Sequence, residues 1–154
     1  GLCYMRTQRP DVPLLYGEEE TFELGGFKQL TQGKDLLIVA SGYMVHIAKQ
    51  ALAILQKAGL SVGLIDAYSM PLKTDGILQE AKKCRSRILV VEDNYIGGIA
   101  DEISSAAAAA GCGTTVQPLF VRNVPKSAKT PEDILEMVRL TKEDVAEAAK
   151  KMAK

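Results

Sequence analysis

Leu36-Leu37-Ile38-Val39-Ala40 is an unbroken apolar run, and it decides the fold class. A half-exposed strand alternates polar and apolar residues, whereas a strand covered on both faces is apolar throughout. Strands of the second kind belong to parallel sheets that have helices on both sides. The run therefore predicts a central strand buried between two helical layers.

The segment before this run predicts a hairpin. Phe27-Lys28-Gln29-Leu30-Thr31 alternates apolar and polar residues, and Gln32-Gly33-Lys34-Asp35 has the composition of a turn. Two strand patterns separated by a short turn usually pair with each other. We therefore expect residues 27–31 to pair antiparallel with residues 36–40.

The rest of the chain alternates between helical and strand patterns. Strands are predicted at residues 62–65, 88–91 and 115–121, and Pro118 indicates that the last is an edge strand or contains a bulge. Helices are predicted at residues 44–58, from Thr74 as N-cap to about residue 85, from Ile99 after Gly97-Gly98 to residue 110, and from Thr141 as cap to about residue 151. Pro131 is predicted to open a helical turn. This order predicts an α/β fold in three layers, helix/sheet/helix, with a mostly parallel sheet of about five strands and one antiparallel strand.

Composition narrows the class of function. The 154 residues suit one domain, and 19 Lys plus Arg against 19 Asp plus Glu give no net charge, which argues against a nucleic-acid partner. Every apolar run is far shorter than the ~20 residues that cross a bilayer, so we expect no membrane partner. Three scattered cysteines without a CxxC pair, and a single histidine, predict reduced thiols in a cytoplasmic protein and no metal site.

Candidate site residues follow the predicted strands, because ligands of open α/β sheets bind beyond the carboxyl ends of strands. His46 lies in the first turn of a helix, where a packed or capping side chain is the simpler interpretation. Glu92 and Asp93 are neighbours that face opposite sides, so one is expected to line a crevice and the other to cap the next loop. Gly97-Gly98 precedes a helix N-terminus that can hold an anion, although a loop needing positive φ explains the pair as well.

Two arginines near the start of the chain form another candidate site. Arg6 and Arg9 flank Thr7-Gln8 in an extended segment before Pro10. Because arginine binds phosphate or carboxylate through two parallel hydrogen bonds, the two side chains could clamp an anion. The alternative is ordinary surface charge.

Motifs along nearly the whole chain resemble, in order, those of the transketolase C-terminal domain. They are Met5–Pro10, Leu36–Gly42 with Val45-His46-x-Ala48, Ile65–Leu72, Ile88–Tyr95 with Gly97-Gly98-Ile99, and Val121–Ser127. The resemblance implies that residues 1–20 are the tail of a preceding pyrimidine-binding domain with its linker, and that residues 21–154 are the C-terminal domain. The departure Ile99-Ala100-Asp101 puts alanine where the family has glycine, and leaves open how closely this loop approaches a partner.

The same resemblance implies a function for the parent protein. Transketolases use thiamine diphosphate and a divalent cation, Mg or Ca, to transfer two-carbon ketol units between sugar phosphates in the pentose phosphate pathway. In the family this cofactor lies between the first two domains, so the resemblance implies no catalytic residue, cofactor or metal in this chain, and no activity of the chain alone. Its implied role is to support a homodimer together with the upstream domains. Arg9 matches the arginine that helps bind the substrate phosphate, and Arg6 is a supporting candidate.

Two alternatives stay open at this point. The first is the matching domain of a 2-oxoacid dehydrogenase E1 beta subunit or of a deoxyxylulose-phosphate synthase, which share much of the 68–72 segment. The second is a free-standing nucleotide- or anion-binding regulatory module that uses Gly42, Asp66 and Gly97-Gly98. The chain does not begin with Met and its first residues lack the pattern of a signal peptide, so we expect the chain to be part of something longer.

Overall fold

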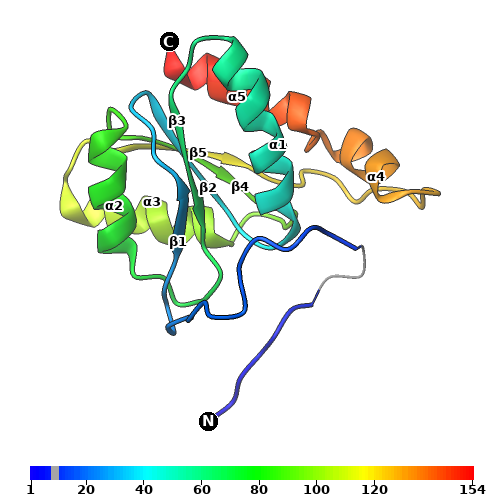
Figure 1. Cartoon of the computed structure of the whole chain (residues 1–154), viewed down its shortest axis with the longest axis horizontal. Helices are drawn as coiled ribbons and strands as arrows, with labels where there is room; N and C mark the ends of the chain where they lie inside the picture. The colour runs from blue at the N-terminus through cyan, green and yellow to red at the C-terminus, as the bar shows by residue number, and fades with distance from the viewer. Residues whose placement is uncertain (8–10) are drawn as a thin grey trace.

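A five-stranded sheet with helices on both faces forms the core of the computed structural model, which describes residues 1–7 and 11–154 (Figure 1). In chain order the elements are β1 (Lys28–Thr31), β2 (Leu36–Ala40), α1 (Tyr43–Lys57), β3 (Val62–Asp66), α2 (Thr74–Lys83), β4 (Arg87–Val91), α3 (Ile99–Ala110), β5 (Thr115–Leu119), α4 (Pro131–Val138) and α5 (Lys142–Ala153). The strand order is β1-β3-β2-β4-β5, and only the β1–β3 pair is antiparallel. The predicted three-layer α/β fold is confirmed.

Strand β2 lies between two parallel neighbours, β3 and β4, and all of its residues are buried. Leu37 and Val39 pack with α2 and α3, whereas Leu36, Ile38 and Ala40 pack with α1 and α5. Successive side chains of a strand point to opposite faces, so a strand covered by helices on both sides needs apolar residues at every position. In Figure 1, α2 lies on one side of the strands and α1 and α5 lie on the other.

The predicted hairpin is wrong. Strand β1 pairs antiparallel with β3, and β3 separates it from β2. Residues 32–35 cross the amino end of β3 instead of turning back on β1: the backbone N–H groups of Lys34 and Asp35 both donate to the Ser61 carbonyl at 2.9 Å. Gly33 makes the crossing possible, because a Cβ there would collide with the backbone of Gly63.

The helix ends agree with sequence patterns in most places. Thr141 caps α5 through a capping box with Asp144, and Thr130 caps α4 in the same way ahead of Pro131. Thr74, in contrast, is the first residue of α2 rather than its N-cap, and among the described residues the N-cap position, Lys73, makes no side-chain capping bond. Strand β5, which contains Pro118, is an edge strand as predicted.

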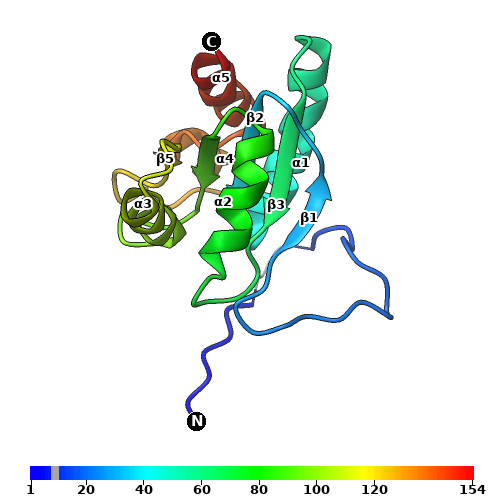
Figure 2. The same ribbon diagram turned by 90° about the vertical axis from the view of Figure 1, so that its left-hand side faces the viewer.

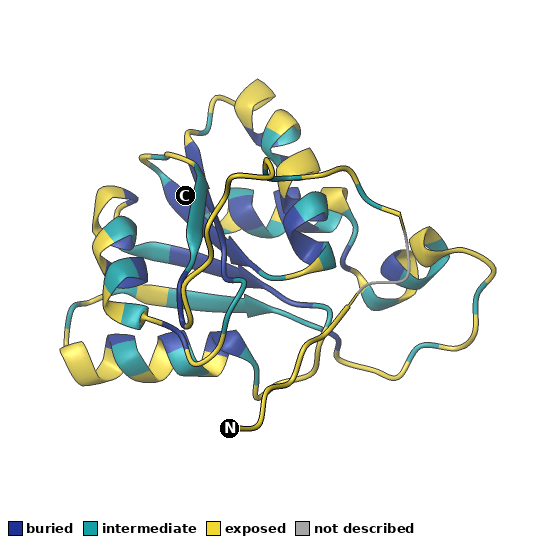
Figure 3. Ribbon diagram, turned by 60° about the horizontal axis from the view of Figure 1, so that its bottom comes forward, coloured by how far each residue is buried: buried dark blue, intermediate teal, exposed yellow. Residues whose placement is uncertain are grey.

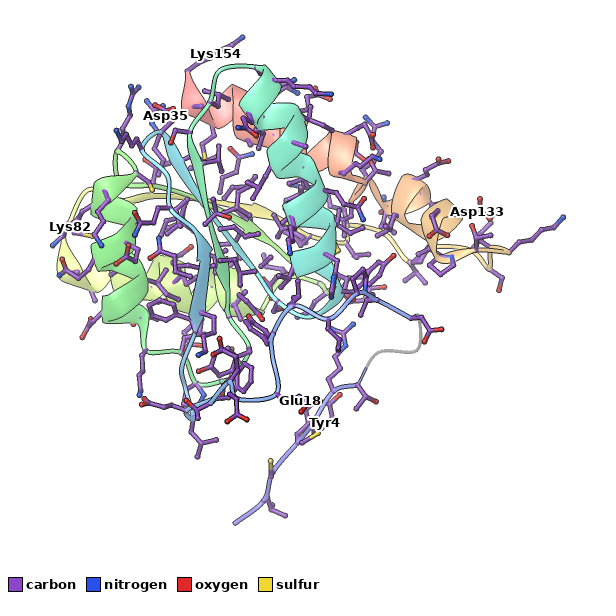
Figure 4. All side chains as sticks on the ribbon, viewed as in Figure 1. Tyr4, Glu18, Asp35, Lys82, Asp133 and Lys154 are labelled. Carbon is purple, nitrogen blue, oxygen red and sulfur yellow. The ribbon has the colours of Figure 1, made fainter. Side chains whose placement is uncertain are left out.

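Residues 11–26, which we call the linker, run outside the sheet past the carboxyl end of β3 (Figure 2). Residues 1–7, the N-terminal segment, extend away from the domain and are exposed throughout (Figure 3). Tyr4 on this segment lies far from the helices (Figure 4). Across the described residues, no helix has both the length and the apolar character needed to span a bilayer.

Candidate functional site

A cavity of about 460 Å³ lies at the carboxyl edge of the sheet, between the N-terminal segment, the loop after β4 and helix α4. Its wall is mostly apolar, and the polar residues on it are few. The lining residues are Arg6, Thr7, Tyr43, Asp93, Tyr95, Val121, Pro125, Pro131, Ile134, Leu135, Val138 and Leu140. The position is the one at which ligands of open α/β sheets bind.

Glu92 and Asp93 follow β4 and point in different directions. The buried Glu92 carboxylate accepts hydrogen bonds from the backbone N–H groups of Ile99, at 2.8 Å, and Ala100, at 3.1 Å. These are two of the first N–H groups of α3, so Glu92 caps that helix from outside it, where the helix dipole favours a negative charge. Asp93 lines the cavity instead. The structure thus separates the two acids into the two positions that strand geometry predicts.

Gly97 and Gly98 lie where the Glu92 side chain reaches the start of α3. Gly97 has a φ of +101°, which an L residue rarely adopts, and a Cβ on Gly98 would collide with the Glu92 carboxylate. The glycines are therefore needed for the bond between Glu92 and the helix. The two N–H groups of Ile99 and Ala100 already have a carboxylate partner from the chain itself, so this helix end is not an open anion site.

Arg6 faces the loop after β4. Its Nη1 donates to Asp93 Oδ1 at 3.0 Å and its Nη2 to Asp93 Oδ2 at 2.6 Å, which is a bidentate ion pair. The two terminal nitrogens of Arg6 thus bind a carboxylate of the same chain. Arg9, the other arginine predicted to bind phosphate, lies outside the described residues.

Asp66, at the end of β3, is buried and bound by the linker. The Tyr16 hydroxyl donates to its Oδ2 at 2.6 Å. Burial raises the pKa of the Asp66 carboxyl, although the Tyr16 hydrogen bond and nearby His46 oppose the shift; burial and the same bond raise the pKa of Tyr16. His46 is half-buried in α1, and burial, reinforced by Lys49, lowers its pKa. These residues form a structural cluster around the linker.

Further contacts hold the linker against the turn after β3. The Glu23 N–H donates to the Tyr68 hydroxyl at 3.2 Å, and the Gly25 N–H donates to Ser69 Oγ at 3.0 Å. Phe22 stacks edge-on against both Tyr16 and Tyr68, with ring centroids 5.1 and 4.9 Å apart. The linker therefore belongs to the folded domain, and it covers the end of β3 where a ribose-binding acid would face a nucleotide.

Residues 1–7 and 11–154 include no group of three or more His, Cys, Asp or Glu side chains that could hold a metal ion. These residues do not fit a diphosphate with its metal, and we assign no step through such a group to this chain. The thiols are free, with Cys84 buried and its pKa raised by that burial. The cavity has a mostly apolar wall and one ion pair, Arg6–Asp93, and such a lining is suited to contact with the surface of another protein or domain.

Sequence reasoning missed two features of this edge. Tyr16 and Asp66 are 50 residues apart, and no spacing or motif marks them as partners. A helical turn was predicted at Pro131, where α4 begins, but the packing of this helix over the carboxyl ends of the strands was not, because its position depends on the long connection between β5 and Pro131. A possible signal was the cluster of apolar positions at 134, 135 and 138, which must face some partner.

Comparison with known proteins assigns the chain to a family. The model of the family "Transketolase, C-terminal domain" matches residues 25–145. Mouse transketolase is 35% identical over 153 residues and human transketolase 34% over 154, each covering 97% of this chain. The chain spans about a quarter, 24%, of the length of these relatives.

Solved structures agree. A structure described as "Split gene transketolase, inactive beta4 tetramer" superposes with a TM-score of 0.83 at 27% identity, covering 92% of this chain and 46% of that one. A transketolase from Pichia stipitis in complex with sedoheptulose 7-phosphate gives a TM-score of 0.59 at 26% identity over 84% of this chain and 18% of that one. The family model matches most of the chain, and the sequences and folds of known transketolases agree with it. The chain therefore belongs to the transketolase C-terminal domain family.

Proposed function

We propose that this chain is the C-terminal docking domain of a transketolase. Its parent would transfer two-carbon ketol units between sugar phosphates in the pentose phosphate pathway, with thiamine diphosphate and a divalent cation held by upstream domains or an upstream subunit. The chain would supply a folded layer that supports a homodimer, and the isolated chain would be inactive. The proposal includes a cytoplasmic location, which its three free thiols support.

The observation that carries the proposal is that the chain's own side chains occupy the ligand positions of its sheet. Glu92 fills the N-terminus of α3, and Tyr16 binds the Asp66 carboxylate. A free-standing nucleotide-binding module would need both positions open. The filled positions thus support a docking domain over that alternative.

Exposed apolar side chains support docking as well. Met70, Tyr95, Ile96 and Val124 project from the loops after β3, β4 and β5, all at the carboxyl edge of the sheet. Leu2, Tyr4 and Met5 are exposed along the N-terminal segment, which borders the same edge through Arg6. Clusters of this kind on one side of a domain are typical of a surface that another protein surface covers.

We further propose that residues 1–20 derive from the end of the preceding pyrimidine-binding domain and the connection that follows it, although residues 11–20 pack on the C-terminal domain, and that residues 21–154 are the C-terminal domain. On this proposal Arg9 contacts the substrate phosphate, and Arg6 lies on the same segment. Arginine suits the role because its planar group binds phosphate oxygens bidentately. The chain would thereby contribute substrate binding, whereas bond making and breaking would occur upstream.

The test is reconstitution. The chain is joined to, or mixed with, the upstream region of its own transketolase, and ketol transfer from a ketose phosphate to an aldose phosphate is followed with thiamine diphosphate and Mg²⁺ present. We expect activity only when both parts are present, together with a heavier complex by light scattering. Full activity of the upstream part alone, or ketol transfer by the isolated chain, would contradict the proposal.

The relatives support transketolase over the 2-oxoacid dehydrogenase E1 beta subunit and the deoxyxylulose-phosphate synthase. The matched mammalian proteins are transketolases, and the matched split-gene structure is described as a transketolase as well. Substrate choice tests this directly, because the alternatives require a 2-oxoacid. Turnover of pyruvate by the reconstituted protein, without ketol transfer, would favour the alternatives.

A further inference from the structure

We propose that Asp93 is a positioning residue: it anchors the N-terminal segment through Arg6 and so sets where that segment lies at the carboxyl edge of the sheet. The expected effect of Asp93 on substrate binding rests on the proposed function above, whereas the anchoring of the N-terminal segment does not. The proposal gives Arg6 a different role from the one its sequence predicts, because its guanidinium is paired within the chain.

The ion pair has the geometry that fixes orientation. Two hydrogen bonds, at 3.0 and 2.6 Å, join the two terminal nitrogens of Arg6 to the two oxygens of Asp93. Parallel bonds of this kind hold the guanidinium plane in line with the carboxylate, which a single contact does not do. The Asp93 side chain is 25% exposed and that of Arg6 58%, so the carboxylate is the better-held partner.

Asp93 can serve as an anchor because the chain around it is held on both sides. Its neighbour Glu92 is buried and bound to the start of α3, and the Glu92 N–H donates to the Leu119 carbonyl at 3.0 Å. On the other side, the Asn94 carbonyl accepts from the Val121 N–H at 2.9 Å. The loop after β4 is thus tied to α3 and to the end of β5, and it presents Asp93 at a defined place.

The N-terminal segment has few other ties to the domain. Its described residues are exposed throughout, Arg6 and Thr7 are the two of them that line the cavity, and Arg6 is the one whose side chain is hydrogen-bonded there. On our proposal the Arg6–Asp93 pair determines the path of the segment. Since the segment leads into Arg9, its path matters for the proposed phosphate contact.

The first experiment uses the chain itself and requires no partner. Trypsin cleaves the Arg6–Thr7 bond only when the Arg6 side chain leaves Asp93 to enter the protease, so the cleavage rate reports how often the pair opens. Mass spectrometry follows cleavage at this bond in the wild type and in Asp93→Asn, Asp93→Glu and Asp101→Asn. Asp101 is an exposed acid on α3 and serves as the matched loss of one negative charge.

We expect Asp93→Asn to raise the cleavage rate about two- to fivefold, the range given by loss of an exposed ion pair. Asp93→Glu keeps a carboxylate and is expected to lie between Asp93→Asn and the wild type, while Asp101→Asn matches the wild type. Circular dichroism checks that each variant is folded. Equal rates for Asp93→Asn and the wild type, or an equal increase in Asp101→Asn, would overturn the anchor.

The second experiment uses the reconstituted transketolase with a phosphorylated ketose donor and with hydroxypyruvate, a donor that lacks the phosphate. Asp93→Asn is expected to raise KM for the phosphorylated donor about two- to fivefold and to leave KM for hydroxypyruvate unchanged, with little change in kcat. A merely structural role would affect both donors. An unchanged KM for the phosphorylated donor would overturn the effect on substrate.

A lowered KM would overturn it as well, because that result would mean that Asp93 competes with the phosphate for Arg6. Failure of the wild-type assembly to transfer ketol units would contradict the proposed function instead. In that case the tryptic cleavage rates still decide whether Asp93 anchors the N-terminal segment. The two failures are therefore distinguishable.

Discussion

Tyr16 donates its hydroxyl to the buried carboxylate of Asp66 across 2.6 Å, although 50 residues separate them in the chain. The bond joins the linker to the carboxyl end of β3 and is partly buried. A charge-assisted bond of this kind is stronger than one between neutral groups. It makes the linker part of the folded unit and closes the end of β3 to ligands.

Replacing Tyr16 with Phe should therefore destabilise the domain. We expect the free energy of unfolding at neutral pH to fall by about 1–2 kcal/mol, because the Asp66 carboxylate loses its donor and stays buried. Urea denaturation followed by circular dichroism measures the change. In the double variant Tyr16→Phe/Asp66→Asn the loss should be smaller than in Tyr16→Phe alone, and strictly additive effects would show that the bond contributes nothing.

The pH dependence of Asp66→Asn gives a separate test. Burial raises the pKa of Asp66 above its ordinary value of 3.8, so the folded state holds this proton more tightly than the unfolded chain. The contribution of Asp66 is then fully present below the unfolded pKa and is lost as pH rises through the folded pKa. Asn does not titrate, so the stability of Asp66→Asn relative to the wild type should increase as the pH rises from below 3.8 through the folded pKa of Asp66. The opposite trend would contradict the prediction.

Glu92→Ala should be among the more damaging single changes at this edge. It removes the carboxylate that binds the Ile99 and Ala100 N–H groups and leaves both donors buried without a partner. We expect a loss of about 2–4 kcal/mol, and a fall in Tm of about 2–4 °C for each kcal/mol. Calorimetry measures the change, and Asp101→Ala on the exposed side of α3 is the control. A Tm equal to that of the control would show that the cap is not needed.

The two glycines before α3 should respond to alanine for different reasons. Gly97→Ala meets open space but must adopt a φ of +101°, a strain of about 1–2 kcal/mol. Gly98→Ala puts a methyl group against the Glu92 carboxylate and should break its bonds to α3. Thermal unfolding of Gly98→Ala in the Glu92→Ala background tests the collision. Without the Glu92 carboxylate, Gly98→Ala should reduce stability only a little. Equal costs in both backgrounds would rule out the collision as the cause.

The helix caps predict a contrast between two threonines. Thr141 accepts a hydrogen bond from the Asp144 N–H at 3.2 Å and caps α5, which packs against the core, so Thr141→Ala should cost about 1 kcal/mol. Thr74 makes no capping bond, and Thr74→Ala should change stability by less than about 0.5 kcal/mol. Urea midpoints of the two variants measure the contrast. Equal losses would mean that the capping box is not what stabilises α5.

Sequence alone determined the layers of this protein. The apolar run of β2 requires helices on both faces of the strand. Apolar residues at helical spacing, together with capping residues, mark the helices that cover those faces. Strand and helix patterns can both be read from the sequence because each follows from the direction of successive side chains along the backbone. The same argument, that neighbouring strand residues face opposite ways, separated Glu92 from Asp93 before their partners were known.

Only the tertiary structure decided which segments meet. Strand β1 pairs with β3 rather than with β2, Tyr16 reaches Asp66, and Arg6 binds Asp93. Strand pairing and side-chain contacts over tens of residues depend on how the whole chain packs, and in particular on where Gly33 lets the backbone cross the sheet. Local patterns carry no information about such distances, because the free energy that selects one pairing over another arises only when the layers are assembled.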